Sequence, residues 1–149
     1  MRLFEFGRNT QQALLYHGTL DRDIEILNPR RSDLVRDDVI FAATFLDVAV
    51  AMTGHWTDDD FDFGRRGQEQ RGEMVRYRLR ELRSGAFEQF FSDPVYVYLV
   101  PSDGFVPHDS IQDFELVNTN SVEPLSYVTI SDPKAFLETS PVVEIINFD

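Results

Sequence analysis

The sequence contains no cysteine. This absence excludes a disulfide, a thiolate nucleophile and a cysteine-bound zinc ion, and it is typical of a cytoplasmic protein, which is where we expect the chain to act. No apolar run approaches the ~20 residues of a membrane span. The first residues include Glu5 and lead into no long apolar segment, so they do not predict a secretory signal. We therefore expect a protein without membrane association.

Positive charge is also scarce. The 149 residues carry 26 acidic and 14 basic side chains, which gives a net charge of −12, and Lys134 is the only lysine. Such a surface repels phosphate backbones and disfavours a general nucleic-acid binder. Solubility, a salty cytoplasm, GC-rich coding that favours arginine, and mimicry of nucleic acid would each explain the excess of acids. Composition does not choose between these explanations.

The basic residues are concentrated in one segment. An acidic stretch at 58–62 is followed by seven arginines within residues 65–83, which we call the arginine island. Its members are Arg65, Arg66, Arg71, Arg76, Arg78, Arg80 and Arg83. Because glycines interrupt these blocks of opposite charge, the pattern predicts a long polar loop around Gly64, Gly67 and Gly72. Such a loop is either ordinary solvated surface or a lid over a site.

Length and composition predict one domain over residues 1–149, since hydrophobic residues make up 42% of the chain and include 13 phenylalanines. Apolar runs and turn residues predict strands at 13–19, 38–44, 74–79, 95–100, 113–117, 126–130 and 142–148. Helices are expected at 45–54, 82–91 and 132–137, with Thr44 and Asp132 as N-caps of the first and last. Strand and helix do not alternate regularly, which predicts an α+β fold with split, mostly antiparallel sheets and a few short helices.

Common site motifs are missing. His17, His55 and His108 lie too far apart in sequence to predict a metal site, so no metal is expected. The chain also lacks a glycine-rich dinucleotide fingerprint, a phosphate-binding loop of the Walker type and a nucleophile elbow. These absences argue against the commonest nucleotide-binding and hydrolase folds.

Four segments nevertheless follow one another in a recognisable order. They are Tyr16-His17-Gly18-Thr19, then Val39 to Thr44 leading into a helix, then Val95 to Phe105, and finally Glu115 to Leu125. In this order the chain resembles the ADP-ribosyltransferase-like superfamily, particularly small bacterial members with a Tyr-His-Gly-Ser/Thr motif. The resemblance covers roughly residues 14–130. Leu116 and Asn118 depart from it, because tryptophan and serine are frequent at these two positions in the family.

The resemblance implies a split sheet with a cleft that binds NAD in a compact conformation. It implies that His17 contacts the adenosine-side ribose, that the Gly18 backbone holds the nicotinamide carboxamide, and that Glu115 is the catalytic glutamate. A carboxylate at that position would stabilise an oxocarbenium cation and orient or deprotonate a nucleophile. The expected cofactor-binding residues are Tyr16, His17, Gly18, Thr19, Phe41 and Thr44, with His17 and Glu115 also as catalytic residues.

Simpler interpretations of the same residues remain open. A strand-end histidine is often a satisfied structural residue, and an acid such as Glu115 is normally solvated on a strand face. Phe114 and Leu116 would point to one face and leave Glu115 on the other. Tyr96 and Tyr98 share a face and are expected to pack against the sheet.

Three functions are compatible with these observations. The first is an NAD-dependent ADP-ribosyltransferase whose acceptor is a protein, a nucleic acid or a small molecule. The second is a non-catalytic acidic interaction protein, such as an inhibitor or a nucleic-acid mimic. The third is a relative of the NAD-consuming RNA 2′-phosphotransferases, in which the arginine island would hold RNA phosphates. The first requires His17 and Glu115 to line one pocket, and the oligomeric state stays open.

Overall fold

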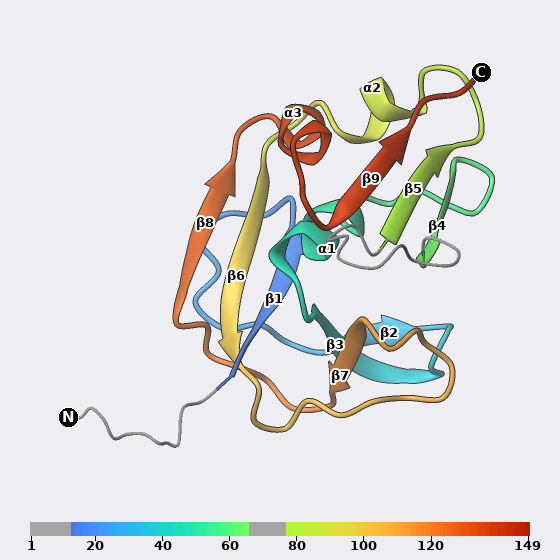
Figure 1. The fold of residues 1–149 in the computed structure, drawn as a ribbon. Coiled ribbons are helices and arrows are strands. Elements are labelled where there is room, and N and C mark those ends of the chain that lie inside the picture. The colour runs from blue at the N-terminus through green and yellow to red at the C-terminus, as the bar shows by residue number, and fades with distance from the viewer. Residues whose placement is uncertain (1–12, 66–76) are drawn as a thin grey trace.

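The computed structural model describes residues 13–65 and 77–149 of the chain. Most of its strands belong to one larger sheet (Figure 1). Its members are β1 (Leu14–Thr19), β2 (Arg30–Ser32), β3 (Asp37–Ala43), β6 (Val95–Pro101), β7 (Glu115–Asn118) and β8 (Ser126–Ile130). The strands run in the order β2-β3-β1-β6-β8, with β7 paired to β3, and all of these pairs are antiparallel.

The larger sheet is split between two of its strands. β1 pairs with β6 along its whole length, from Leu14 to Thr19. By contrast, β1 and β3 pair only at Tyr16 and Ala43. Ala43 is also the residue that pairs with Glu115 of β7. Beyond this single junction β1 and β3 separate, and the functional cleft described below opens between them.

A second, smaller sheet contains β4 (Phe61–Arg65), β5 (Tyr77–Glu81) and β9 (Val143–Ile146). β4 and β5 are antiparallel, whereas β5 and β9 are parallel. Two mostly antiparallel sheets with short helices confirm the α+β fold class predicted from the sequence. Figure 1 shows α1 between this sheet and the β1–β6–β8 side of the larger one.

The three helices are short. They are α1 (Leu46–Ala51), α2 (Ala86–Phe90) and α3 (Pro133–Glu138). The prediction for α3 is confirmed, because the Asp132 side chain accepts a hydrogen bond from the Ala135 amide at 3.1 Å. The Thr44 N-cap is wrong, since Phe45 occupies that position without a side-chain cap. Thr44 instead donates its amide to the Phe114 carbonyl at 3.0 Å, which draws it into contact with β7.

The helix predicted over 82–91 begins later than expected. Gly85 is its N-cap and has a φ of +88°, a left-handed conformation that ends any helix approaching from residue 82. Only the part from Ala86 to Phe90 is helical. The remaining strand predictions are confirmed to within a few residues, although residues 74–76 of the strand predicted at 74–79 lie outside the described part of the chain.

The polar loop predicted around Gly64, Gly67 and Gly72 is wrong at Gly64, which lies in β4, whereas Gly67 and Gly72 lie outside the described residues. Phe61–Arg65 and Tyr77–Glu81 form the β4–β5 pair, and Phe61 is only 1% exposed. Inward and outward side chains alternate along this strand, so Phe61 and Phe63 face inward while the charged residue between them faces solvent. The charged residues make the strand hard to recognise in the sequence. Arg66, Arg71 and Arg76 lie outside the described residues.

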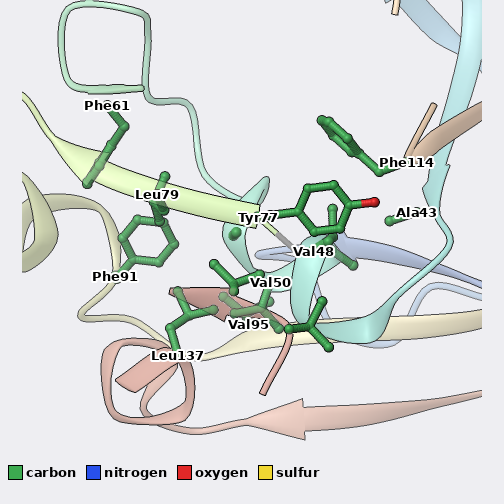
Figure 2. Packing of buried hydrophobic residues seen from close by; sticks show 14 of the residues in the cluster. Ala43, Val48, Val50, Phe61, Tyr77, Leu79, Phe91, Val95, Phe114 and Leu137 are labelled. Carbon is green, nitrogen blue, oxygen red and sulfur yellow. The ribbon is translucent and has the colours of Figure 1, made fainter. Parts of the chain in front are cut away.

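Aromatic packing joins the two sheets. Phe61 of β4 meets the rings of Phe87 and Phe91 at centroid distances of 4.9 and 5.4 Å. At the other end, Phe114 makes edge contacts with Phe63 at 5.1 Å and Tyr77 at 5.2 Å. Figure 2 shows Tyr77 and Phe114 next to one another, close to Ala43 at the strand junction. Edge-to-face pairs of this kind add to the apolar burial that holds β4 and β5 against the larger sheet.

None of the helices in the described part of the chain is long and apolar enough to cross a membrane.

Glu81 is a buried acid with a structural task. It is 7% exposed, and its two carboxylate oxygens accept hydrogen bonds from the amides of Phe87 and Phe148, each at 2.8 Å. One side chain therefore holds β5, the start of α2 and the C-terminal segment together.

We expect Glu81→Gln to destabilise the fold by about 2 kcal/mol, because an amide accepts only one of the two backbone hydrogen bonds. Urea unfolding measures this change. Glu138→Gln on the exposed face of α3 is the control and should shift the free energy of unfolding little. Equal stability of the two variants would contradict the role given to Glu81.

Candidate functional site

A cleft of about 360 Å³ opens where β1 and β3 separate, and both His17 and Glu115 line it. His17 lies on β1 and Glu115 lies on β7, and both are next to the junction at Ala43. Tyr16 of β1 pairs with Ala43 of β3, and Ala43 pairs with Glu115 of β7. Glu115 is therefore at one end of this row of three paired residues, and His17 directly follows Tyr16 at the other end. His17 and Glu115, which are 98 positions apart in the sequence, therefore line the same cleft.

His17 has a defined protonation state. Its Nδ1 lies 2.7 Å from the carbonyl oxygen of Phe41, which can only accept a hydrogen bond, so Nδ1 carries the proton. Burial lowers the pKa of the imidazole, and the nearby Arg30 lowers it further, against the opposing effect of the Phe41 hydrogen bond. His17 is thus neutral at pH 7, with Nε2 as an acceptor. No described residue donates a hydrogen bond to Nε2.

Glu115 is partly buried and lacks a compensating partner. None of the described residues donates a hydrogen bond to its carboxylate or forms an ion pair with it. Burial raises its pKa from 4.5 to about 7. Near neutral pH the side chain therefore populates both an ionised form, which can stabilise positive charge, and a protonated form. A carboxylate poised in this way is suited to accept or release a proton.

The residues before Glu115 are held tightly. The Phe114 carbonyl accepts hydrogen bonds from the Thr44 amide at 3.0 Å and from the Thr44 hydroxyl at 3.4 Å. The Phe114 ring is clamped by Phe63 and Tyr77, and the Asp113 carboxylate is paired with Arg65 of β4. Contacts from the smaller sheet therefore fix the start of β7, and with it the position of Glu115.

Gly18 is required by packing. A Cβ atom at this position would lie 2.2 Å from the Thr53 hydroxyl and 2.6 Å from the Ala49 carbonyl oxygen. Both distances are far below van der Waals contact, so a larger residue would push α1 and the turn after it away from β1. The glycine therefore lets α1 approach β1, and its backbone lines the cleft.

A second, larger cleft of about 740 Å³ adjoins the first and shares His17, Gly18 and Phe41 with it. Arg30 and Arg31 of β2 line this cleft. The sequence does not predict their place at a site, because β2 is a short, exposed strand without a motif. Glu115 lines the smaller cleft, whereas Arg30, Arg31 and Asp21 line the larger one, and Asp33 lies 3.8 Å from Arg31.

The candidate residues from the sequence fall into three groups. Tyr16, His17, Gly18, Phe41 and Glu115 line the smaller cleft. Thr19 lines the larger one, where its hydroxyl accepts a hydrogen bond from the Asp21 amide at 3.1 Å. Thr44 lines neither cleft and contacts Phe114 instead.

In the described part of the arginine island, Arg65, Arg78 and Arg80 lie on β4 and β5, and Arg83 follows β5. Three of these four arginines form ion pairs with described residues. Arg65 is paired with Asp113, Arg80 with Asp62 at 3.5 Å, and Arg83 with Asp60 at 2.9 Å. These arginines line neither cleft. Among the residues that the structure describes, no three histidine, aspartate or glutamate side chains are grouped to hold a metal ion.

Comparisons with protein-family models, with curated proteins and with solved structures find no match to this chain.

Glu115 should make stability depend on pH. Its folded-state pKa of about 7 is raised above the ordinary 4.5, so its contribution to stability is complete below pH 4.5 and is lost as pH rises through 7. We expect Glu115→Gln to match the original protein near pH 4.5 and to be more stable above pH 7, by on the order of 2–3 kcal/mol. Urea unfolding across this range tests the prediction.

The exposed Glu123→Gln is the control and should show no such divergence. A constant difference between Glu115→Gln and the original protein at every pH would contradict the raised pKa.

Proposed function

We propose that the protein binds NAD in the two adjoining clefts and transfers ADP-ribose to an acceptor. The observation that supports this most strongly is that His17 and Glu115, distant in sequence, line one cleft at the split of the sheet. Tyr16, Gly18 and Phe41, which the resemblance to the ADP-ribosyltransferase-like superfamily also indicates as binding residues, line the same cleft. The split sheet is also the architecture that the resemblance implies.

The charges in the clefts suit this ligand. NAD has a cationic pyridinium ring at one end and an anionic diphosphate in its middle. The pyridinium fits the smaller cleft beside Glu115, where Tyr16 and Phe41 supply aromatic surface. The diphosphate fits the larger cleft, where Arg30 and Arg31 supply positive charge. Because Glu115 lines one cleft and Arg30 lines the other, one orientation of the dinucleotide is favoured.

The proposed reaction uses Glu115 in its ionised form. The bond between the pyridinium nitrogen and the ribose C1′ breaks, and nicotinamide leaves with the bonding electron pair as a neutral molecule. The ribose then carries an oxocarbenium cation, which the Glu115 carboxylate stabilises. The acceptor atom bonds to C1′, and its proton passes to the same carboxylate. A pKa near neutrality allows Glu115 to take that proton and release it afterwards.

The proposed role of His17 is binding and orientation. Because its Nδ1 proton is committed to Phe41, Nε2 is available to accept a hydrogen bond from a ribose hydroxyl. A neutral imidazole performs this task without adding charge beside the pyridinium. The Phe41 hydrogen bond fixes the ring, so that the acceptor is in place before the ligand arrives.

NAD should stabilise the folded protein. At 100 times its Kd a ligand adds ~2.7 kcal/mol, which for a chain of this size raises the Tm by roughly 5–10 °C. We expect this shift with millimolar NAD in both the original protein and Glu115→Gln. Nicotinamide release, followed by chromatography, should fall by at least ~100-fold in Glu115→Gln only.

Glu138→Gln is the control variant and should retain both the Tm shift and the release of nicotinamide. A Tm that does not respond to NAD would overturn the proposed function and favour a non-catalytic acidic interaction protein. Equal nicotinamide release by the original protein and Glu115→Gln would overturn the assignment of Glu115.

A further inference from the structure

β8 is an edge strand that no described element covers. It pairs with β6 on one side, and the larger sheet ends there (Figure 1). The exposed fractions of Tyr127 and Val128, on its two faces, are 40% and 39%. Leu125, just before the strand, is 62% exposed. A chain rich in acids thus leaves apolar side chains and free backbone groups together at this edge.

The edge also lacks the usual protection against pairing. Natural edge strands carry lysine, proline, an inward charge or a bulge that prevents another strand from adding to them. β8 reads Ser-Tyr-Val-Thr-Ile, contains none of these residues, and pairs with β6 in unbroken register from Ser126 to Ile130. Its free side is therefore able to accept an extended chain as a further strand.

An acidic, aromatic groove of about 290 Å³ begins at the same strand. Tyr127 and Tyr98 form one wall, with ring centroids 5.2 Å apart. Tyr98 is anchored, since its hydroxyl accepts a hydrogen bond from the Ile24 amide at 3.0 Å and donates one to the Asp21 carbonyl at 3.2 Å. Glu25 and Glu123 also line the groove.

These two glutamates have no cation beside them. Both are exposed, and neither forms an ion pair with any residue that the structure describes. Asp60, by contrast, is paired with Arg83 at 2.9 Å. Two unmatched carboxylates beside an exposed tyrosine ring favour a lysine or arginine side chain, which gains both ion pairing and a cation–π contact.

We propose that β8 and this groove bind an extended basic segment of another protein. The segment adds to β8 as an antiparallel or parallel strand and places one lysine or arginine between Glu25 and Glu123. Charge complementarity identifies the occupant, because the chain carries a net charge of −12. A second copy of this chain is disfavoured, since its own edge would bring the same carboxylates to the interface.

This site is separate from the NAD clefts but adjoins them. Ile24 lines both the groove and the larger cleft. A segment bound at β8 would therefore be separated from the proposed NAD site only by the stretch of chain that contains Ile24. The proposal does not depend on NAD, so its test is carried out without NAD.

The test uses a fluorescent peptide of about eight residues in which arginine alternates with valine, with a glutamate–valine peptide as the reference. Anisotropy at about 150 mM salt measures binding while surface attraction is screened. We expect Glu25→Gln/Glu123→Gln to weaken binding of the basic peptide at least ~10-fold. The matched control, Asp58→Asn/Glu138→Gln, removes the same charge from exposed positions outside the groove and should weaken it less than ~3-fold.

A second variant tests the strand edge. Val128→Lys places a charge on the exposed edge without changing either glutamate, and it should also weaken binding at least ~10-fold. Circular dichroism verifies that each variant is folded. If the double glutamate variant and its control weaken peptide binding equally, the proposal is overturned, because the net negative charge alone would then explain binding. Unchanged peptide binding by Val128→Lys would also overturn the proposal. So would the finding that the original protein forms dimers and that Val128→Lys dissociates them.

Discussion

The structure of the site depends on one place where two strands stop pairing. β1 and β3 meet only at Tyr16 and Ala43, and the backbone groups beyond that pair need other partners. The His17 side chain supplies one by donating from Nδ1 to the Phe41 carbonyl at 2.7 Å. The imidazole thereby links β1 to β3 where their backbones no longer pair, and the hydrogen bond to Phe41 fixes its tautomer and orientation. An unbroken sheet would provide neither the cleft nor a histidine with an available Nε2.

Packing around the junction determines what faces the cleft. The absence of a side chain at Gly18 lets α1 lie against β1, since a Cβ would approach the Ala49 carbonyl to 2.6 Å. On the opposite side, the register between Ala43 and Glu115 carries the carboxylate to the same opening. The smaller sheet holds that register through the Phe114 ring. Both sheets are therefore needed to place one acid opposite one histidine.

The sequence predicts those elements whose burial is visible locally. The apolar run of β6 and the capped start of α3 are examples. It misses β4, because charges conceal two inward phenylalanines whose burial depends on partners elsewhere in the chain. Thr44 follows a local capping rule, but a tertiary hydrogen bond to Phe114 prevails. His17 and Glu115 could be proposed from the resemblance, whereas Arg30 could not, because its place in the cleft follows only from strand pairing.

The acids of this chain differ in how they are satisfied, and the difference indicates function. Glu81 is buried, yet two backbone amides donate hydrogen bonds to its carboxylate, each at 2.8 Å. Asp60 is paired with Arg83. Glu115 has neither kind of partner among the described residues, and its pKa of about 7 records the free-energy cost of burying it. A fold that satisfies Glu81 and Asp60 but leaves Glu115 uncompensated has a site whose missing positive charge a cationic ligand would supply.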